Sequence, residues 1–186
     1  MGSRKTILAT AAAVLAAAAM GGEARAEETT CRGLLGIPVV DNLRVPAGAR
    51  CVLSGTYVQG TVKVERGAEL DASSIRVVGN VQAENARMVR LRSSRVGGSV
   101  QLKQGGAATV NGNRINGDLQ LESNRAELRA NRNTIGGSLQ AFQNTGGLSI
   151  YYNQIDGNLQ CKANSPRPIG QGNVVQGSKE DQCARL

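Results

Sequence analysis

Apolar and polar residues alternate around a glycine that recurs along the chain, as in INGDLQLESN at 115–124. The glycine returns at a nearly constant interval, at Gly60, Gly79, Gly98, Gly117, Gly137, Gly157 and Gly177. A β-branched residue lies two positions before each glycine, and a valine or leucine lies two positions after six of the seven. This period of two predicts a strand in every repeat.

One strand per repeat cannot bury its own apolar face, but stacked repeats bury a continuous column and pair the strands in parallel. Two more apolar columns share the period: Val45, Val64, Ala83, Leu102, Leu121, Ala141 and Cys161; and Cys51, Leu70, Val89, Ala108, Leu128 and Leu148. We therefore predict an all-β fold, a single-stranded parallel β-helix solenoid of seven coils, each of roughly 19–20 residues. The strict hexapeptide pattern of left-handed helices is absent, which favours right-handed coiling.

Residues 1–26 are typical of an export signal. Arg4 and Lys5 precede an alanine-rich run, and cleavage is expected after Ala26. No later stretch has the roughly 20 apolar residues of a transmembrane helix. We expect a mature protein without a transmembrane segment, secreted or periplasmic.

The mature chain is expected to divide into three parts. These are an N-terminal cap at 27–44, the β-helix at 45–178, and a C-terminal cap at 179–186 that a disulfide ties down. A chain that spans 27–186 is long enough for one domain with a core.

The four cysteines permit three pairings. The interval from Cys31 to Cys51 is about one coil, and so is the interval from Cys161 to Cys183. Residues one coil apart stack at about 4.8 Å, inside the Cα separation of a disulfide, whereas a bond from Cys51 to Cys161 would cross about 25 Å. We predict the bonds Cys31–Cys51 and Cys161–Cys183, one at each end of the rod.

Two asparagine columns repeat once per coil. They are Asn113, Asn133, Asn153 and Asn173; and Asn124, Asn144 and Asn164. Asparagine accepts the left-handed backbone of a tight corner, and its amide can bond to the same residue one coil away. We predict two structural ladders at corners.

Outward residues form four columns, which we expect side by side on the glycine-bearing sheet. The candidate binding residues in these columns are Arg76, Arg95, Arg114, Asp118, Gln101, Gln120 and Gln140. The arginines break a local rule because like charges on neighbouring strands repel. Two interpretations stay open: a strip that binds an acidic polymer, or a solvated face on which arginine stems cover apolar surface. The glutamines are expected to form an amide ladder.

Charge and composition narrow the partners. The chain has a net charge of +8, which becomes +6 after loss of the signal, and this favours an anionic envelope polymer; a protein partner stays open. Nucleic acid is disfavoured because the chain has only one phenylalanine and three tyrosines to stack on bases. The basic segment RMVRLRSSR at 87–95 is interpreted as a solvated strand. Without histidine, and with its cysteine pairs at opposite ends, the chain predicts neither a metal site nor a cofactor.

The phrases INGDL and VERGAEL, which recur in similar form at the period of the coils, resemble the bactofilins, bacterial β-helix proteins that polymerise end to end. The resemblance covers about residues 43–160 and implies the β-helix fold. The export signal, the disulfides and the asparagine ladders depart from that family, and stapled ends argue against polymerisation. The closing segment resembles small secreted bacterial β-helix proteins of uncharacterised function.

The sequence therefore predicts an exported, non-enzymatic structural or binding module of the cell envelope or the exterior. The alternative is a carbohydrate-active enzyme, a polysaccharide lyase or hydrolase, on a minimal β-helix. Such enzymes need clustered carboxylates. Asp118 and Asp156 are expected roughly 10 Å or more apart, which disfavours the enzyme.

Overall fold

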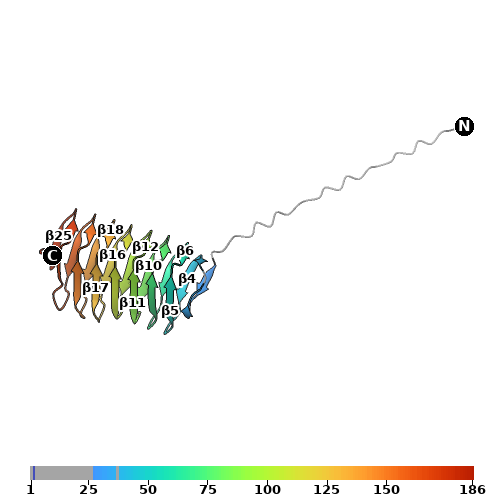
Figure 1. Ribbon diagram of the computed structural model, residues 1–186, viewed down its shortest axis with the longest axis horizontal. Helices are drawn as coiled ribbons and strands as arrows, with labels where there is room; N and C mark the ends of the chain where they lie inside the picture. The colour runs from blue at the N-terminus through green and yellow to red at the C-terminus, as the bar shows by residue number, and fades with distance from the viewer. Residues whose placement is uncertain (1, 3–26, 37) are drawn as a thin grey trace.

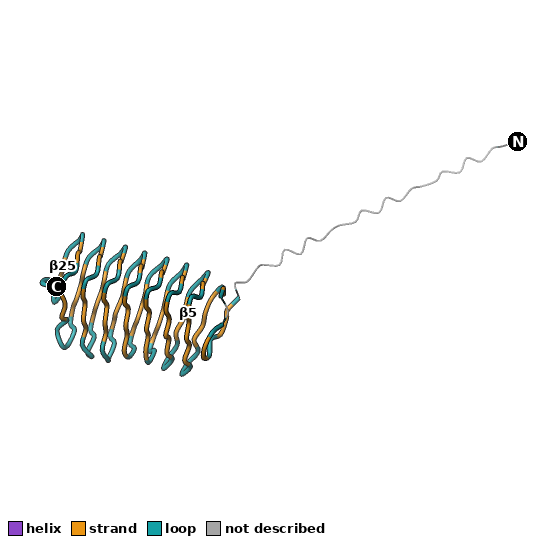
Figure 2. Tube along the Cα trace, viewed as in Figure 1, coloured by secondary structure: helices purple, strands orange, loops and turns teal. Residues whose placement is uncertain are grey.

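A computed structural model describes residues 2, 27–36 and 38–186. Over these residues the chain is a parallel β-solenoid of about eight turns with no helix. The coils lie side by side along a rod (Figure 1), and loops join the strands at the edges of the stack (Figure 2). Apart from Gly2, the predicted signal peptide lies outside the described residues.

Three parallel sheets, which we name A, B and C, form the sides of the rod. Sheet A contains β1 (Glu28–Thr30), β4 (Asn42–Val45), β7 (Val62–Val64), β10 (Val81–Glu84), β13 (Val100–Lys103), β16 (Leu119–Glu122), β19 (Leu139–Phe142), β22 (Leu159–Lys162) and β25 (Lys179–Asp181). Sheet B contains β2 (Gly33–Leu34), β5 (Arg50–Ser54), β8 (Glu69–Ser73), β11 (Met88–Arg92), β14 (Ala107–Asn111), β17 (Leu128–Asn131), β20 (Leu148–Tyr151) and β23 (Ile169–Gln171). Sheet C contains β3 (Val39–Val40), β6 (Tyr57–Val58), β9 (Arg76–Val77), β12 (Arg95–Val96), β15 (Arg114–Ile115), β18 (Thr134–Ile135), β21 (Gln154–Ile155) and β24 (Val174–Val175).

The register of the sheets reproduces the period of the sequence. Val100 lies opposite Val81 on one side and Leu119 on the other, and Leu119 in turn lies opposite Leu139. Each of these partners holds the equivalent position in the next repeat. Both long apolar columns predicted from the sequence are buried throughout. Stacking like on like thus builds one continuous core along the axis of the rod.

The described residues of the predicted N-terminal cap, 27–36 and 38–44, contribute a coil of the solenoid. Strands β1, β2 and β3 lie one in each sheet and pair in parallel with the next coil, which adds a turn to the seven predicted. The step to the next coil is shorter here than elsewhere, since Thr29 lies opposite Leu43, so the period of the glycines does not reveal this coil. At the other end, β25 extends sheet A past residue 178, and a turn at 182–185 follows it.

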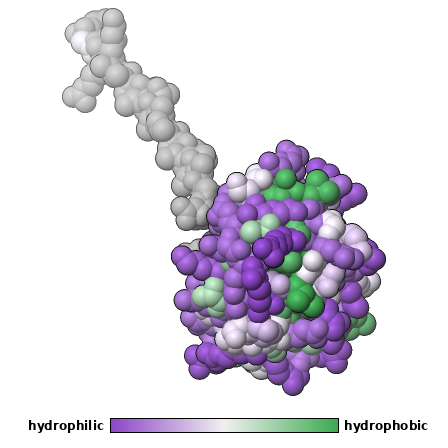
Figure 3. Space-filling model, turned by 90° about the vertical axis from the view of Figure 1, so that its left-hand side faces the viewer, coloured by the Kyte–Doolittle hydropathy of each residue, from purple (hydrophilic) through white to green (hydrophobic). Residues whose placement is uncertain are grey.

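Both ends of the rod keep some apolar surface. Leu34 in the first coil is 76% exposed, and Ile169 and Val174 in the last coil are 60% and 64% exposed. Figure 3 faces the C-terminal end, where hydrophobic residues form separate patches among polar ones. The structure therefore covers its core at the ends only in part.

The recurring glycine is needed because successive coils come close together at this position. A Cβ at Gly117 would lie 3.0 Å from the carbonyl carbon and oxygen of Gly98, and it would also collide with the hydroxyl of Ser99. None of the seven recurring glycines has a positive φ. Space for the neighbouring coil, and not backbone conformation, selects the glycine.

Both predicted asparagine ladders are present, with their side chains buried. Asn133 is typical of an inner rung. Its Nδ2 donates to Oδ1 of Asn153 (3.0 Å) and to the carbonyl of Val110 (2.8 Å), and its Oδ1 accepts the backbone N–H of Asn113 (3.0 Å). The second ladder ends where Nδ2 of Asn164 donates to Oε1 of Gln182 (3.0 Å). Each amide thus satisfies its neighbour inside the core.

The predicted backbone conformation of these asparagines was wrong. The left-handed residue is the one before each asparagine of the first ladder: Gly112 (φ 66°), Arg132 (φ 54°), Tyr152 (φ 57°) and Gly172 (φ 69°). This preceding residue makes the corner and is exposed, whereas the asparagine itself points into the core. The corner is therefore made by a residue whose type varies from coil to coil.

Both predicted disulfides are confirmed. The Cα atoms of Cys31 and Cys51 are 5.5 Å apart, and those of Cys161 and Cys183 are 5.2 Å apart. All four cysteines are buried. One bond ties each terminal coil to its neighbour.

Replacing Asn133 by Ala should destabilise the fold strongly, because the carbonyl of Val110 and the N–H of Asn113 lose their partner inside the core. We expect the free energy of unfolding to fall by about 3 kcal/mol, against less than about 1 kcal/mol for Gln140→Ala in a more exposed ladder. Urea denaturation measures both losses. Equal losses would contradict the role given to the buried ladder.

The double variant Cys161→Ser/Cys183→Ser should lose about 3 kcal/mol, because the bond closes a loop of roughly 20 residues in the unfolded chain. Urea midpoints with and without reductant provide the measurement. Cys31→Ser/Cys51→Ser is the matched control at the other end and should lose a similar amount. If reduction left the midpoint of the unmodified protein unchanged, the assigned role would be wrong.

Candidate functional site

The candidate binding residues lie on two faces of the rod. The expectation of four columns on one sheet was wrong, because the chain turns a corner at the recurring glycine. The three arginines begin strands β9, β12 and β15 of sheet C, whereas the three glutamines lie in β13, β16 and β19 of sheet A. Asp118 lies at the corner between these two sheets, directly before β16.

Arg76, Arg95 and Arg114 form what we call the arginine strip. Arg95 lies directly opposite Arg76 on one side and Arg114 on the other, so the three occupy successive rungs. All three side chains are exposed, and within residues 27–36 and 38–186 none of them makes an ion pair. The Cζ atom of Arg76 lies 5.3 Å from the ring centre of Tyr57, one coil earlier, in a cation–π contact.

The arginines at 87, 90 and 92, in and beside β11 of sheet B, pair with acids, unlike those of the strip. A nitrogen of Arg92 lies 2.6 Å from Asp71 and one of Arg90 lies 3.7 Å from it, and Arg87 pairs with Glu69. The acids belong to β8, one coil before the arginines of β11. Residues 87–92 of the segment RMVRLRSSR therefore form a face of paired charges, whereas Arg95 at its end belongs to the arginine strip.

A further ion pair joins two of the N-terminal coils. Nε of Arg44 lies 2.8 Å from Oε1 of Glu65. The hydrogen bond from Arg44 lowers the pKa of Glu65, and the same bond with the glutamate charge raises the pKa of Arg44. Because the pKa of Glu65 is lowered, the pair persists below the ordinary range of a glutamate and is lost as pH falls through the lowered value.

A groove of about 420 Å³ runs beside the arginine strip. The strip forms one wall. Val78, Gly97 and Asn116 form the floor, again on three successive coils, and Val78 is 49% exposed. These three residues were missed as candidates, and the signal that could have found them is their column, whose mixed types follow the arginines by two positions.

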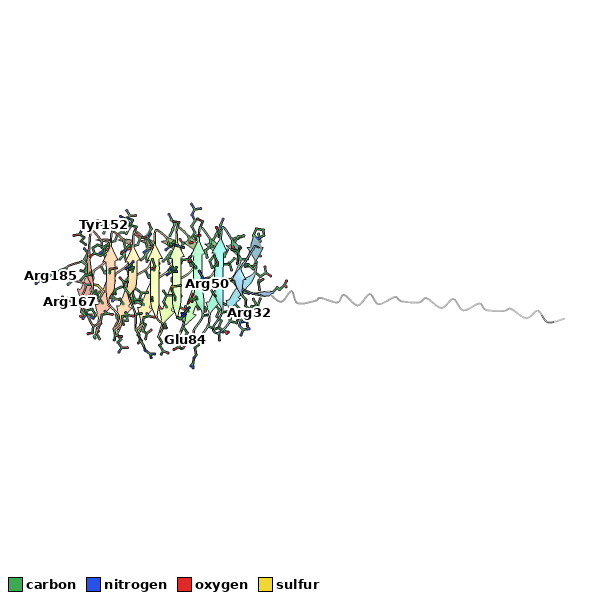
Figure 4. All side chains as sticks on the ribbon, turned by 60° about the horizontal axis from the view of Figure 1, so that its bottom comes forward. Arg32, Arg50, Glu84, Tyr152, Arg167 and Arg185 are labelled. Carbon is green, nitrogen blue, oxygen red and sulfur yellow. A yellow bond between two sulfur atoms is a disulfide. The ribbon has the colours of Figure 1, made fainter. Side chains whose placement is uncertain are left out.

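The predicted glutamine ladder is present in sheet A as two stretches, Gln82 to Gln120 and Gln140 to Gln160. Nε2 donates to the Oε1 one coil further on from Gln82 to Gln101 (3.1 Å), from Gln101 to Gln120 (3.2 Å) and from Gln140 to Gln160 (3.1 Å). A hollow of about 590 Å³ lies beside its first rungs, lined by both signs of charge from Lys63, Glu84 and Lys103. Figure 4 labels Glu84. These amides bond to one another along the sheet.

Asp118 belongs to a third ladder, which the sequence did not reveal. At this corner each side-chain oxygen accepts the backbone N–H of the equivalent residue one coil later. Ser99 Oγ accepts from Asp118 (3.0 Å), and Asp118 Oδ1 accepts from Ser138 (2.7 Å). The ladder consists of Asn42, Thr61, Asn80, Ser99, Asp118, Ser138 and Asn158, and it ends on the N–H of Ser178. Asp118 therefore has a structural task.

The part of the chain that the structure describes contains neither a metal-binding cluster nor a membrane-spanning helix. No group of three or more histidine, cysteine, aspartate or glutamate side chains gathers there as a metal site. No helix there is long and apolar enough to cross a membrane.

Comparisons with known proteins add no relative. The chain matches no family model, and it matches neither a curated protein nor a solved structure. The resemblance to bactofilins stays a prediction.

Asp118→Asn should leave the stability unchanged, because the ladder already uses asparagine at Asn80 and Asn158 and needs only an acceptor oxygen. Asp118→Ala should cost about 1 kcal/mol, since the N–H of Ser138 loses its partner. Thermal melting of the two variants measures the difference. A large loss in Asp118→Asn would indicate that the charge itself matters there.

Proposed function

We propose that the protein is an exported, non-enzymatic binding module that holds an acidic polymer of the cell envelope or the exterior on its arginine strip. The observation that carries this proposal is the contrast between sheets. Glu69 and Asp71 of β8 pair with Arg87 and Arg92 one coil later, whereas sheet C stacks three arginines in register without an ion pair among the described residues. Like charges in this arrangement repel, and an anionic ligand would relieve the repulsion.

The side-chain chemistry fits this role. A guanidinium presents a planar fork of donors that matches a carboxylate or a phosphate, and it stays charged at any physiological pH. The cation–π contact with Tyr57 supports the first guanidinium of the strip. A mature net charge of +6 would draw a polyanion toward the rod before it reaches the strip.

The disulfides are relevant to the cellular compartment of the protein. Bonds of this kind persist in oxidising compartments, so Cys31–Cys51 and Cys161–Cys183 are compatible with an extracellular or periplasmic protein. Export by a signal cleaved after Ala26 belongs to the proposal.

Replacing all three arginines of the strip by Gln should weaken binding to an immobilised anionic polysaccharide roughly tenfold, taking about 0.5 kcal/mol for each exposed charge contact. The measurement is the salt concentration that elutes the mature protein, together with the dissociation constant at fixed salt.

The matched control removes the same charge elsewhere. Arg50, Arg66 and Arg125 are exposed and make no ion pair within the described residues, and Figure 4 labels Arg50. Their triple Gln variant should keep most of the affinity. Equal weakening in the two triple variants would mean that the strip contributes only through the overall charge of the protein. Turnover of the polysaccharide would contradict a non-enzymatic role.

A further inference from the structure

We propose that the groove beside the arginine strip takes a polyuronate, an acidic polysaccharide with one carboxylate on every sugar, lying parallel to the axis of the rod. This inference rests on the proposed function and narrows it to one chemical class. It is carried by the spacing of the strip, by the floor of the groove and by the ends of the strip.

The spacing selects a regular polyanion. Strands β9, β12 and β15 are direct neighbours in one sheet, so the strip offers one guanidinium about every 4.8 Å along the axis. A 1→4-linked sugar is about as long as this step, and adjacent sugars of a polyuronate are turned relative to each other, so carboxylates of alternate sugars face the strip. Two such carboxylates can meet Arg76 and Arg114, with Arg95 between them and within reach of either. Inorganic polyphosphate carries its charges more closely than the strip, so most of its phosphates would have no arginine opposite them.

The floor favours a sugar over a bare chain of phosphates. Val78 presents half-exposed apolar surface beside Arg76, and Gly97 presents no side chain at all beside Arg95. Gly97 cannot be larger, because its Cβ would collide with the carbonyl oxygen of Val78 in the coil below. The C–H face of a pyranose ring gains from covering such a floor, and a phosphate chain has no apolar face to offer.

The number of arginines in the strip defines the minimum length of the ligand. Tyr57 precedes Arg76 in the column, and Thr134 follows Arg114, so the charge covers three rungs. Asn116 adds an amide to the floor at the third rung, suited to a sugar hydroxyl. The smallest ligand that uses every arginine is therefore a trisaccharide.

The test is calorimetric titration of the mature, disulfide-bonded protein with four probes: trigalacturonate, its methyl ester, inorganic polyphosphate, and vesicles of anionic phospholipid. We expect trigalacturonate to bind and the methyl ester, which has the same rings without charge, to bind at least roughly tenfold more weakly. Arg95→Gln should weaken trigalacturonate roughly fivefold. Arg125→Gln, a cation outside the groove, should change it little.

The floor is tested by Val78→Ser, which should weaken trigalacturonate roughly threefold and leave polyphosphate unchanged. Val174→Ser is the matched control, an exposed valine of the same sheet outside the groove. Thermal melting verifies that each variant is folded.

The outcomes separate the two proposals. Tighter binding of polyphosphate or vesicles than of trigalacturonate, lowered by Arg95→Gln and insensitive to Val78→Ser, would overturn the polyuronate and keep the anion-binding strip. Failure of all the anionic probes to bind would overturn both.

Discussion

Translation by one coil governs this molecule, because every residue lies about 4.8 Å from its own counterpart in the neighbouring coils. A side chain that recurs in one column must therefore be compatible with a copy of itself. Leucine, isoleucine and valine meet this condition by packing. Asparagine and glutamine meet it because an amide is both donor and acceptor, so that Asn133 can bond to Asn153 and Gln140 to Gln160.

Charged residues do not meet this condition, because like charges stacked in one column repel. The chain avoids or offsets this repulsion in different ways. Arginines of β11 stack on acids of β8, and Lys103 pairs with Glu122 one coil later. Asp118 avoids a second carboxylate because serine lies on both sides of it in the corner ladder. The arginine strip stacks three like charges without an acidic partner among the described residues, which distinguishes sheet C from the other two faces.

Much of the fold was predictable from the sequence because the repeat length determines which residues lie opposite each other in neighbouring coils. The buried columns, both disulfides and both asparagine ladders follow from counting residues between equivalent positions. The division into three sheets does not follow from this counting. Inward residues lie two positions before and two positions after Gly117, so the apolar alternation continues across the corner and does not reveal it. The first coil was missed since its offset differs, and the structural task of Asp118 was missed since it bonds to a backbone N–H, which the residue types do not reveal.

The position of the two disulfides has a consequence for how the rod comes apart. Each inner coil has neighbours on both sides, so fraying must begin at a terminal coil, where one neighbour is missing. Cys31–Cys51 and Cys161–Cys183 bind those coils covalently to the next, so neither can peel off alone. The smallest opening then involves two coils at once. The bonds thereby raise the kinetic barrier against a protease, and they extend the lifetime of the folded rod beyond what its equilibrium stability alone would give.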